Sequence, residues 1–256
     1  MKILPPITHP WPERIARRHV PKPSVAEYGY RTYRPCLRWE FGFSCGFCLV
    51  HEMDLSLAVG RALMETEHFI PVHVRPDLAN SYGNCFHACH ACNHQRGTQP
   101  NRGPLGERLL NACDDLWEDH FEVVADEIRP RDRDPDATYT CDVYDLNDPA
   151  KVRMRQLRRK IIAAGLRAVE ARALSVELRE QDAALEEVDP DSLARRDEQL
   201  LASQRLWSLY EMFMEQLSWY APVPWDADPL CRCESLSEDS ELPTVLAVQL
   251  IDVDLP

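Results

Sequence analysis

The chain of 256 residues has no apolar run long enough to form a transmembrane helix. Its first residues, Met-Lys-Ile-Leu-Pro-Pro, also lack the apolar core of a secretory signal. These two absences argue against a membrane-spanning or exported protein. We therefore expect the chain to work in the reducing cytoplasm.

Cysteine is too sparse for a disulfide-stabilised secreted scaffold, although the chain contains ten cysteines. Four of them form two Cys-x-x-Cys pairs, Cys45 with Cys48 and Cys89 with Cys92. Two such pairs supply the four thiolates of a tetrahedral site. The alternatives are packed core thiols or a redox pair, which needs only one pair and a βαβ pattern that is missing here. The sequence therefore predicts a structural zinc site.

An excess of positive charge is also missing, because the formal net charge is −13. The charge is unevenly distributed along the chain. Residues 1–104 carry 12 basic and 8 acidic side chains, a net charge of +4. Residues 105–256 carry 17 basic and 34 acidic side chains, a net charge of −17. Because an acidic surface is repelled by a phosphate backbone, contact with nucleic acid is expected in the first part.

Between and after the cysteine pairs lies a set of polar residues in a characteristic order. The residues of this pattern are Glu67, His68, Phe69, Pro71, Asn84, Cys89, Cys92, Asn93 and Arg96. With this pattern, which covers roughly a quarter of the chain, the segment resembles the HNH endonucleases, the ββα-metal nucleases, in their zinc-bearing form. Three positions depart from the commoner family residues: Glu67 replaces Asp, Cys85 replaces an apolar residue, and Asn93 replaces the last His.

The resemblance implies metal-dependent hydrolysis of phosphodiester bonds in DNA. His68 would be the general base, because a neutral imidazole accepts a proton near neutral pH. Glu67 and Asn93 would hold Mg²⁺ or Mn²⁺ through oxygen ligands, and the metal would stabilise the developing charge. Asn84 would orient the loop around the base. Arg96 would bind a substrate phosphate through its guanidinium fork.

A rival hypothesis keeps the zinc module but removes the chemistry. The module would then bind nucleic acid or a partner protein without cutting. The joint presence of Glu67, His68 and Asn93 favours the enzyme. His94 is an alternative metal ligand, and His51 is expected to be structural, although it could compete for zinc.

The expected fold class is α+β, with a zinc-stapled ββα-metal module followed by a C-terminal α-helical hairpin. The basic, Pro-rich arm could grip a nucleic-acid strand through phosphate contacts and stacking, or could pack on the module, and both alternatives remain open. The expected divisions are the arm (residues 1–35), the nuclease module (36–106), a helix and β-hairpin extension (107–147), the helical hairpin (148–220), and an acidic tail that could end in a strand (221–256).

Periodicity and capping residues give the local expectations. Apolar spacing and helix formers predict helices, Asp148-Pro149 is a typical helix start, and Gly97 is a typical helix end. Alternating and β-branched residues predict strands. The helices are expected over 54–66, 90–96, 107–119, 148 to about 186, and from 190 onward, and the strands over 67–74, 120–124 and 137–144.

A nuclease module with a long added helical region also resembles the nuclease subunits of bacterial anti-phage systems, of the Septu type and its retron-linked relatives. Those subunits act beside an ATPase. The resemblance implies that an ATPase or another protein partner binds the helical hairpin. The alternative is a hairpin packed only on its own apolar face.

Overall fold

The computed structural model describes residues 28–60, 63–183 and 190–218, together with residues 15, 17–19, 21, 22 and 233. These residues contain helices and two small antiparallel sheets, which agrees with the expected α+β class. The chain divides into two compact units, Met1–Arg155 with Pro222–Pro256, and Gln156–Ala221. Within the described ranges, no helix is both long enough and apolar enough to cross a membrane.

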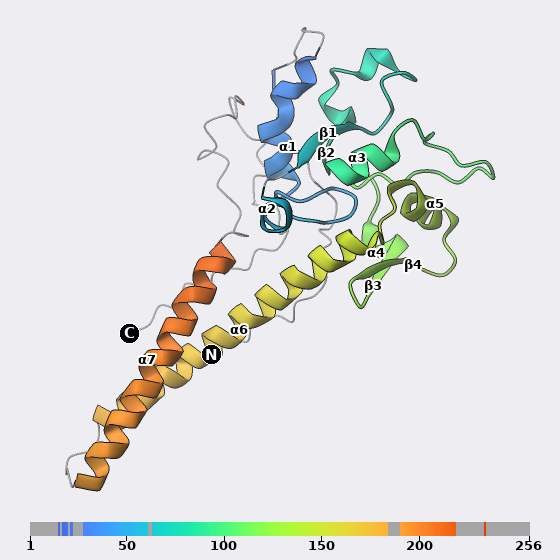
Figure 1. Cartoon of the computed structure of the whole chain (residues 1–256). Helices are drawn as coiled ribbons and strands as arrows, with labels where there is room; N and C mark the ends of the chain where they lie inside the picture. The colour runs from blue at the N-terminus through green and yellow to red at the C-terminus, as the bar shows by residue number, and fades with distance from the viewer. Residues whose placement is uncertain are drawn as a thin grey trace. The chain divides into compact units, whose positions relative to one another are not determined.

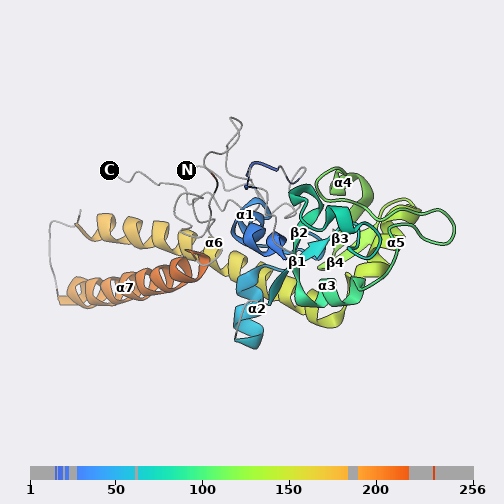
Figure 2. The same cartoon turned by 90° about the horizontal axis from the view of Figure 1, so that it is seen from above.

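A β-hairpin followed by a helix forms the centre of the first unit. Strand β1 (Met64–His68) pairs antiparallel with β2 (Cys85–Cys89), so that His68 lies opposite Cys85. Helix α3 (His90–Arg96) follows β2 directly and packs against both strands, as Figures 1 and 2 show. This helix has the bounds that the sequence predicted, and Gly97 is its C-cap.

The remaining elements of the first unit surround this hairpin. Helix α1 precedes the first cysteine pair, α2 follows it, and a second small sheet joins β3 to β4. Their bounds are η1 (Gly29–Tyr33), α1 (Arg34–Glu40), α2 (Glu52–Val59), η2 (Pro76–Leu78), η3 (Tyr82–Asn84), α4 (Trp117–His120), β3 (Phe121–Val124), β4 (Glu127–Pro130) and α5 (Pro135–Tyr144).

The hydrophobic core of this unit reaches from the N-terminal segment to α5. Phe47, inside the first cysteine pair, stacks on Tyr144 of α5 with ring centroids 3.9 Å apart. Leu110 and Leu146 are fully buried in the same cluster. Residues beyond 106 therefore complete the core of the expected nuclease module.

Helix α2 is shorter than the expected 54–66. His51, rather than Asp54, is its N-cap: the His51 Nδ1 accepts from the Met53 N–H at 3.1 Å. Asp54 completes a capping box by accepting from the His51 N–H at 2.8 Å. The helix ends at Gly60, whose φ of 76° suits a residue without a side chain. His51 therefore has a structural role in capping, as expected.

The expected strand over 67–74 is displaced, because β1 ends at His68. Beyond it, the Ile70 N–H donates to the Asn84 amide oxygen at 2.8 Å, and the Asn84 amide nitrogen donates to the Ile70 carbonyl at 3.0 Å. Pro71 then accepts from the Val74 N–H at 2.9 Å and closes a turn. Pro cannot donate to a ladder, which removes the basis for a strand through residue 71.

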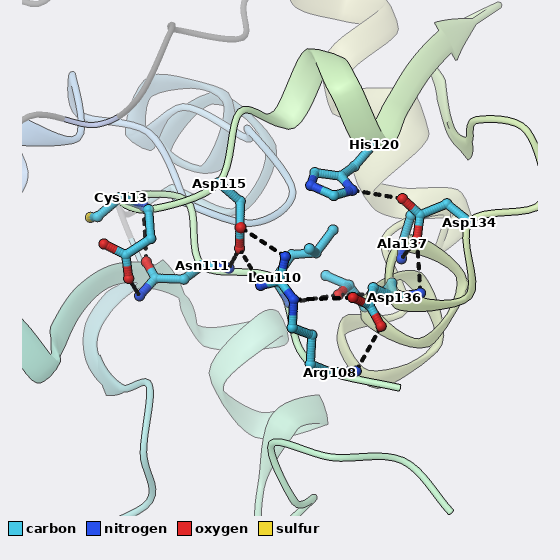
Figure 3. A network of polar contacts seen from close by, with 11 residues as sticks. Arg108, Leu110, Asn111, Cys113, Asp115, His120, Asp134, Asp136 and Ala137 are labelled. Atoms are coloured by element: carbon cyan, nitrogen blue, oxygen red, sulfur yellow. Dashed lines mark hydrogen bonds and ion pairs between the residues drawn. The ribbon is translucent and has the colours of Figure 1, made fainter. Parts of the chain in front are cut away.

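The expected helix over 107–119 is wrong apart from its last turn, because side chains take the backbone N–H groups that a helix would use. Asp136 accepts from the Arg108 N–H at 2.8 Å, and Thr140 accepts from the Leu110 N–H at 3.0 Å. Asp115 accepts from the Asn111 N–H at 2.7 Å and from the Arg108 guanidinium at 2.8 Å and 2.9 Å. This network of polar contacts holds the segment in an irregular path (Figure 3).

The expected strand over 137–144 is also wrong, because these residues form α5. Asp134 caps this helix by accepting from the N–H groups of Asp136 and Ala137 at 2.9 Å and 3.0 Å, and Pro135 occupies its first turn. An Asp-Pro pair is a helix start, so the capping signal outweighs the β-forming Thr, Tyr and Val residues that follow. The partner of β3 is β4, over residues 127–130.

The second unit contains most of the expected helical hairpin. Helix α6 (Pro149–Ala183) begins with Asp148 as the predicted cap, whose Oδ1 accepts from the Ala150 N–H at 2.9 Å. Helix α7 (Pro190–Ser218) runs beside it (Figure 1), and the hydroxyls of Ser175 and Ser203 meet between them at 2.7 Å. The proposed final strand within 221–256 lies outside the described residues.

Candidate metal centre and the His68 site

The four cysteines of the two Cys-x-x-Cys pairs come together in the first unit. Their sulfur atoms all lie within 4.8 Å of one another, and all four residues are buried. The Cys48 and Cys89 sulfurs are 3.7 Å apart. A tetrahedral zinc ion with Zn–S bonds of about 2.3 Å needs sulfurs about 3.8 Å apart. The thiol group Cys45, Cys48, Cys89 and Cys92 could therefore hold a zinc ion.

Local backbone structure fixes both cysteine pairs. Cys89 is the N-cap of α3, and its sulfur accepts from the Cys92 N–H at 3.4 Å. In the other pair, the backbone carbonyl of Cys45 accepts from the Leu49 N–H at 3.0 Å, and the Gly46 N–H donates to the His87 carbonyl at 2.9 Å. A side chain at Gly46 would meet the buried Phe41 ring at 2.5 Å, so the packing of this ring against the turn requires glycine.

The surroundings of the thiols favour the ionised form of Cys45. Burial opposes ionisation, but hydrogen bonds from the neighbouring thiols lower the pKa of Cys45 well below its usual value. Hydrogen bonds with Cys45 and Cys48 raise the pKa of Cys89, and burial raises the pKa of Cys92. Burial also opposes the charge on Lys151, yet the four nearby thiols raise the pKa of this buried ammonium. Arg155 adds a second cation by donating to the Cys48 carbonyl at 3.2 Å. A negatively charged metal–thiolate centre would be balanced by these cations.

His68 lies at the end of β1 with one ring nitrogen fixed. Its Nε2 is 2.9 Å from the Ala79 carbonyl oxygen. A carbonyl only accepts, so Nε2 carries the proton and Nδ1 keeps its lone pair. Burial lowers the pKa of His68, and the hydrogen bond to Ala79 opposes that shift only in part. The imidazole is therefore neutral at pH 7 and able to accept a proton at Nδ1.

Asn84 closes the loop that carries Ala79. Its amide oxygen accepts from the Ile70 N–H, and its amide nitrogen donates to the Ile70 carbonyl at 3.0 Å and to the Leu78 carbonyl at 3.4 Å. The bonds join the two ends of the loop between β1 and β2. Asn84 thus has the geometry of the loop-orienting residue that the sequence predicted.

The N-terminal arm reaches both this loop and the core of the module. The Tyr30 ring meets the His68 ring edge to face with centroids 4.6 Å apart, and the Tyr30 N–H donates to Asn80 at 3.1 Å. Arg17 donates to the Cys85 carbonyl at 2.6 Å and to Glu40 at 3.3 Å. The described part of the arm therefore packs on the module, which was one of the two alternatives.

Glu67 and Arg96 form a buried pair between β1 and α3. The Arg96 Nε lies 4.0 Å from a Glu67 oxygen, and the Arg96 side chain is fully buried. Its terminal nitrogen donates to the Phe69 carbonyl at 3.3 Å and to Asn101 at 3.1 Å. Burial raises the pKa of Glu67 to about 8, although Arg96 opposes this. The expected phosphate contact of Arg96 does not match this interior position.

A different acid, Glu65, meets Asn93. The Asn93 amide nitrogen donates to one Glu65 oxygen at 2.5 Å, and the His90 Nδ1 lies 2.7 Å from the other. His90 and Glu65 are exposed by 56% and 40% of their side chains, so this group faces solvent. The structure therefore places Asn93 beside Glu65, whereas the sequence paired it with Glu67.

Glu65 was not predicted from the sequence, because the expected strand began at residue 67, whereas β1 begins at Met64. Residues two apart on a strand share a face, so Glu65 and Glu67 both face α3.

His94, the alternative ligand, is exposed and stacks on the His90 ring with centroids 5.9 Å apart. His87, in contrast, is buried on β2, and burial lowers its pKa to about 3, which fits a neutral structural residue.

No protein-family model matches the chain, and no curated protein or solved structure matches it either. The interpretation of both sites therefore depends on their own geometry and chemistry.

Proposed function

We propose that the chain is a metal-dependent endonuclease of the HNH type that hydrolyses phosphodiester bonds in DNA. In this proposal a zinc ion held by Cys45, Cys48, Cys89 and Cys92 staples the module together. The order β1, β2, α3, with the cysteine cluster at the junction of β2 and α3, supports this interpretation. His68 stands at the end of the first strand, where the hydrolytic base is expected.

The observation that carries the proposal is the hydrogen bond from His68 Nε2 to the Ala79 carbonyl, at 2.9 Å. It leaves Nδ1 as the acceptor nitrogen of a neutral ring. A general base needs both properties, since it must take a proton from water at physiological pH. Asn84 holds the loop that presents the Ala79 carbonyl, and Tyr30 packs against the imidazole, so both keep the base in position.

The donor groups on the α3 side of β1 suit a hard divalent cation. Glu65, Glu67 and Asn93 offer carboxylate and amide oxygens, which are the ligand types of Mg²⁺ and Mn²⁺. A bound cation would supply charge stabilisation for the phosphate and the leaving oxygen. We assign the exposed Glu65 a share of this role because it already contacts Asn93.

One observation favours the rival, a module that binds without cutting. Burial keeps the Glu67 carboxyl protonated near pH 7, and Arg96 is turned into the interior. A protonated acid is a poor metal ligand, and a buried guanidinium offers no phosphate contact from solvent. Only an activity assay separates the two functions.

The assay is nicking of supercoiled plasmid by the full chain with Mg²⁺ or Mn²⁺. We expect cleavage by the parent chain and a loss of about 10²- to 10⁴-fold in the His68→Ala variant, the usual cost of removing a general base. His73→Ala is the matched control, because His73 is an exposed histidine five positions further on. Parallel assays with single-stranded DNA and RNA define the substrate class.

Equal nicking by the parent and His68→Ala would overturn the assignment of the base. Absence of nicking by the parent, together with DNA binding in a mobility-shift assay, would favour the rival. Retention of zinc in the His68→Ala variant confirms that any lost activity does not come from unfolding.

The proposal extends to a role in defence against phage, beside an ATPase. Its support is the architecture alone, a metal-centred unit followed by the long helices of Gln156–Ala221. The test is phage plating on cells that carry the chain with its native genomic neighbours. Protection that His68→Ala abolishes and His73→Ala preserves would support the role.

A further inference from the structure

A second group of metal-binding side chains joins distant parts of the first unit. His19 comes from the N-terminal arm, Cys36 from α1, and Cys233 from the C-terminal segment. Their ligand atoms all lie within 4.8 Å of one another, the same limit that the four-cysteine centre meets. Cys36 and Cys233 are separated by 197 positions in the chain, and their sulfurs are 3.4 Å apart.

The first two of these residues are held by the core. The His19 N–H donates to the Glu40 carboxylate at 2.7 Å, and its ring packs on Trp39 with centroids 5.0 Å apart. Cys36 is only 1% exposed, on the inner face of α1, and His19 is 3% exposed. The contacts with Glu40 and Trp39 and the burial in α1 therefore fix the imidazole of His19 and the thiol of Cys36 independently of Cys233.

The chemistry of the set distinguishes a metal site from a disulfide. A disulfide bond brings two sulfurs to about 2.05 Å, and an imidazole takes no part in it. The observed 3.4 Å is far longer, and it is close to the separation of about 3.8 Å for two thiolates on one zinc ion. Two thiols and an imidazole are also a common zinc donor set.

We propose that His19, Cys36 and Cys233 bind a second zinc ion, which joins Cys233 to α1 and to His19. Three protein ligands would leave the fourth position of a tetrahedral zinc ion to water. The second site is independent of the nuclease proposal, because none of its residues belongs to the His68 site.

Elemental analysis of the purified full chain tests the proposal. We expect two zinc ions per parent chain after dialysis against a weak chelator. Cys233→Ser and Cys36→Ser should each retain one zinc, and the remaining zinc shows that the four-cysteine centre is intact. Cys141→Ser is the matched control, because Cys141 is half-buried and belongs to neither cluster, and it should retain two.

Cobalt substitution gives an independent measurement. Cys233→Ser should remove the absorption of one site and leave that of the four-cysteine centre. One zinc per parent chain, or two in Cys233→Ser, would overturn the second site. A peptide linked through Cys36 and Cys233 in non-reducing mass spectra of freshly purified chain would overturn it in favour of a disulfide.

Discussion

The four-cysteine centre and the His68 site share β2 and α3, yet they differ in their access to solvent. All four thiols are buried, and the cations of Lys151 and Arg155 lie near them. Glu65 and His90, on the α3 side of β1, are exposed. A closed donor set is typical of a structural metal, and an open one leaves room for water and substrate. Under the proposed function, this difference predicts that the first site stabilises the fold and that the second carries the chemistry.

The largest expected effect is the loss of stability when a ligand of the four-cysteine centre is replaced. Cys89→Ser removes one thiolate and keeps a side chain that can cap α3, so the chain should lose its tightly held zinc and the first unit should unfold for that reason. Structural zinc contributes on the order of 10 kcal/mol to small domains. Circular dichroism during a thermal scan, together with zinc analysis, measures both changes.

Cys141→Ser is again the control, and it should keep the melting temperature of the parent chain within a few degrees. A Cys89→Ser variant that melts like the parent and binds no zinc would show that packing alone holds β2 and α3. In that case the contrast between a structural and a chemical site would be lost.

A smaller effect is expected from substitutions of Glu65 and Glu67, the two acids of the second site. If the exposed Glu65 is a metal ligand, Glu65→Gln should raise the Mg²⁺ concentration for half-maximal nicking by about 10- to 100-fold, the scale of a lost metal-site partner. Glu67→Gln should have the smaller effect, because the Glu67 carboxyl is buried and protonated near pH 7. Binding of Mn²⁺, followed by electron paramagnetic resonance, gives the same comparison without cleavage.

The reverse order, with the larger loss in Glu67→Gln, would return the metal to the acid beside His68. Equal and unchanged Mg²⁺ requirements would remove both carboxylates from the metal site. Either result would leave the role of His68 as base untouched, because His68→Ala tests it separately.

The four-cysteine centre was easier to predict from the sequence than the contacts of the second site. The cysteine group was predictable because each pair is fixed by its own short spacing, and the pairs needed only to meet. Asn84 was predictable as a loop residue for a similar reason. The pairing of Asn93 with Glu65 depends on which residues of β1 face α3, and strand alternation gives that only once the bounds of β1 are known.

The errors in the fold have a related cause. Residues 107–116 have helical periodicity, but Asp115 and Asp136, which hold Arg108 and its neighbours, keep the backbone irregular. Asp136 belongs to a later segment, and periodicity within residues 107–116 gives no sign of its contact with Arg108. The α5 error was avoidable, since Asp134-Pro135 is the same start signal as Asp148-Pro149, which was interpreted correctly.

The smallest predicted effect concerns the pH dependence of stability. Burial raises the pKa of Glu67 from an ordinary 4.5 to about 8, so the folded chain holds this proton more tightly than the unfolded chain does. The contribution of Glu67 to stability is therefore fully present below about pH 4.5 and is lost as the pH rises through about 8. Glu67→Gln stays uncharged and should reduce the fall in melting temperature between pH 5 and pH 8 by a few degrees.

The measurement is a set of thermal scans in zinc-containing buffer without added Mg²⁺, so that the four-cysteine centre stays loaded. Glu118→Gln, at an exposed glutamate, controls for the loss of one negative charge and should follow the parent chain. Other groups titrate in all three chains, so only the difference between the curves counts. Superimposable curves for Glu67→Gln and the parent would show that the Glu67 carboxyl is solvated, and the proposed difference between the two acids of β1 would then lose its basis.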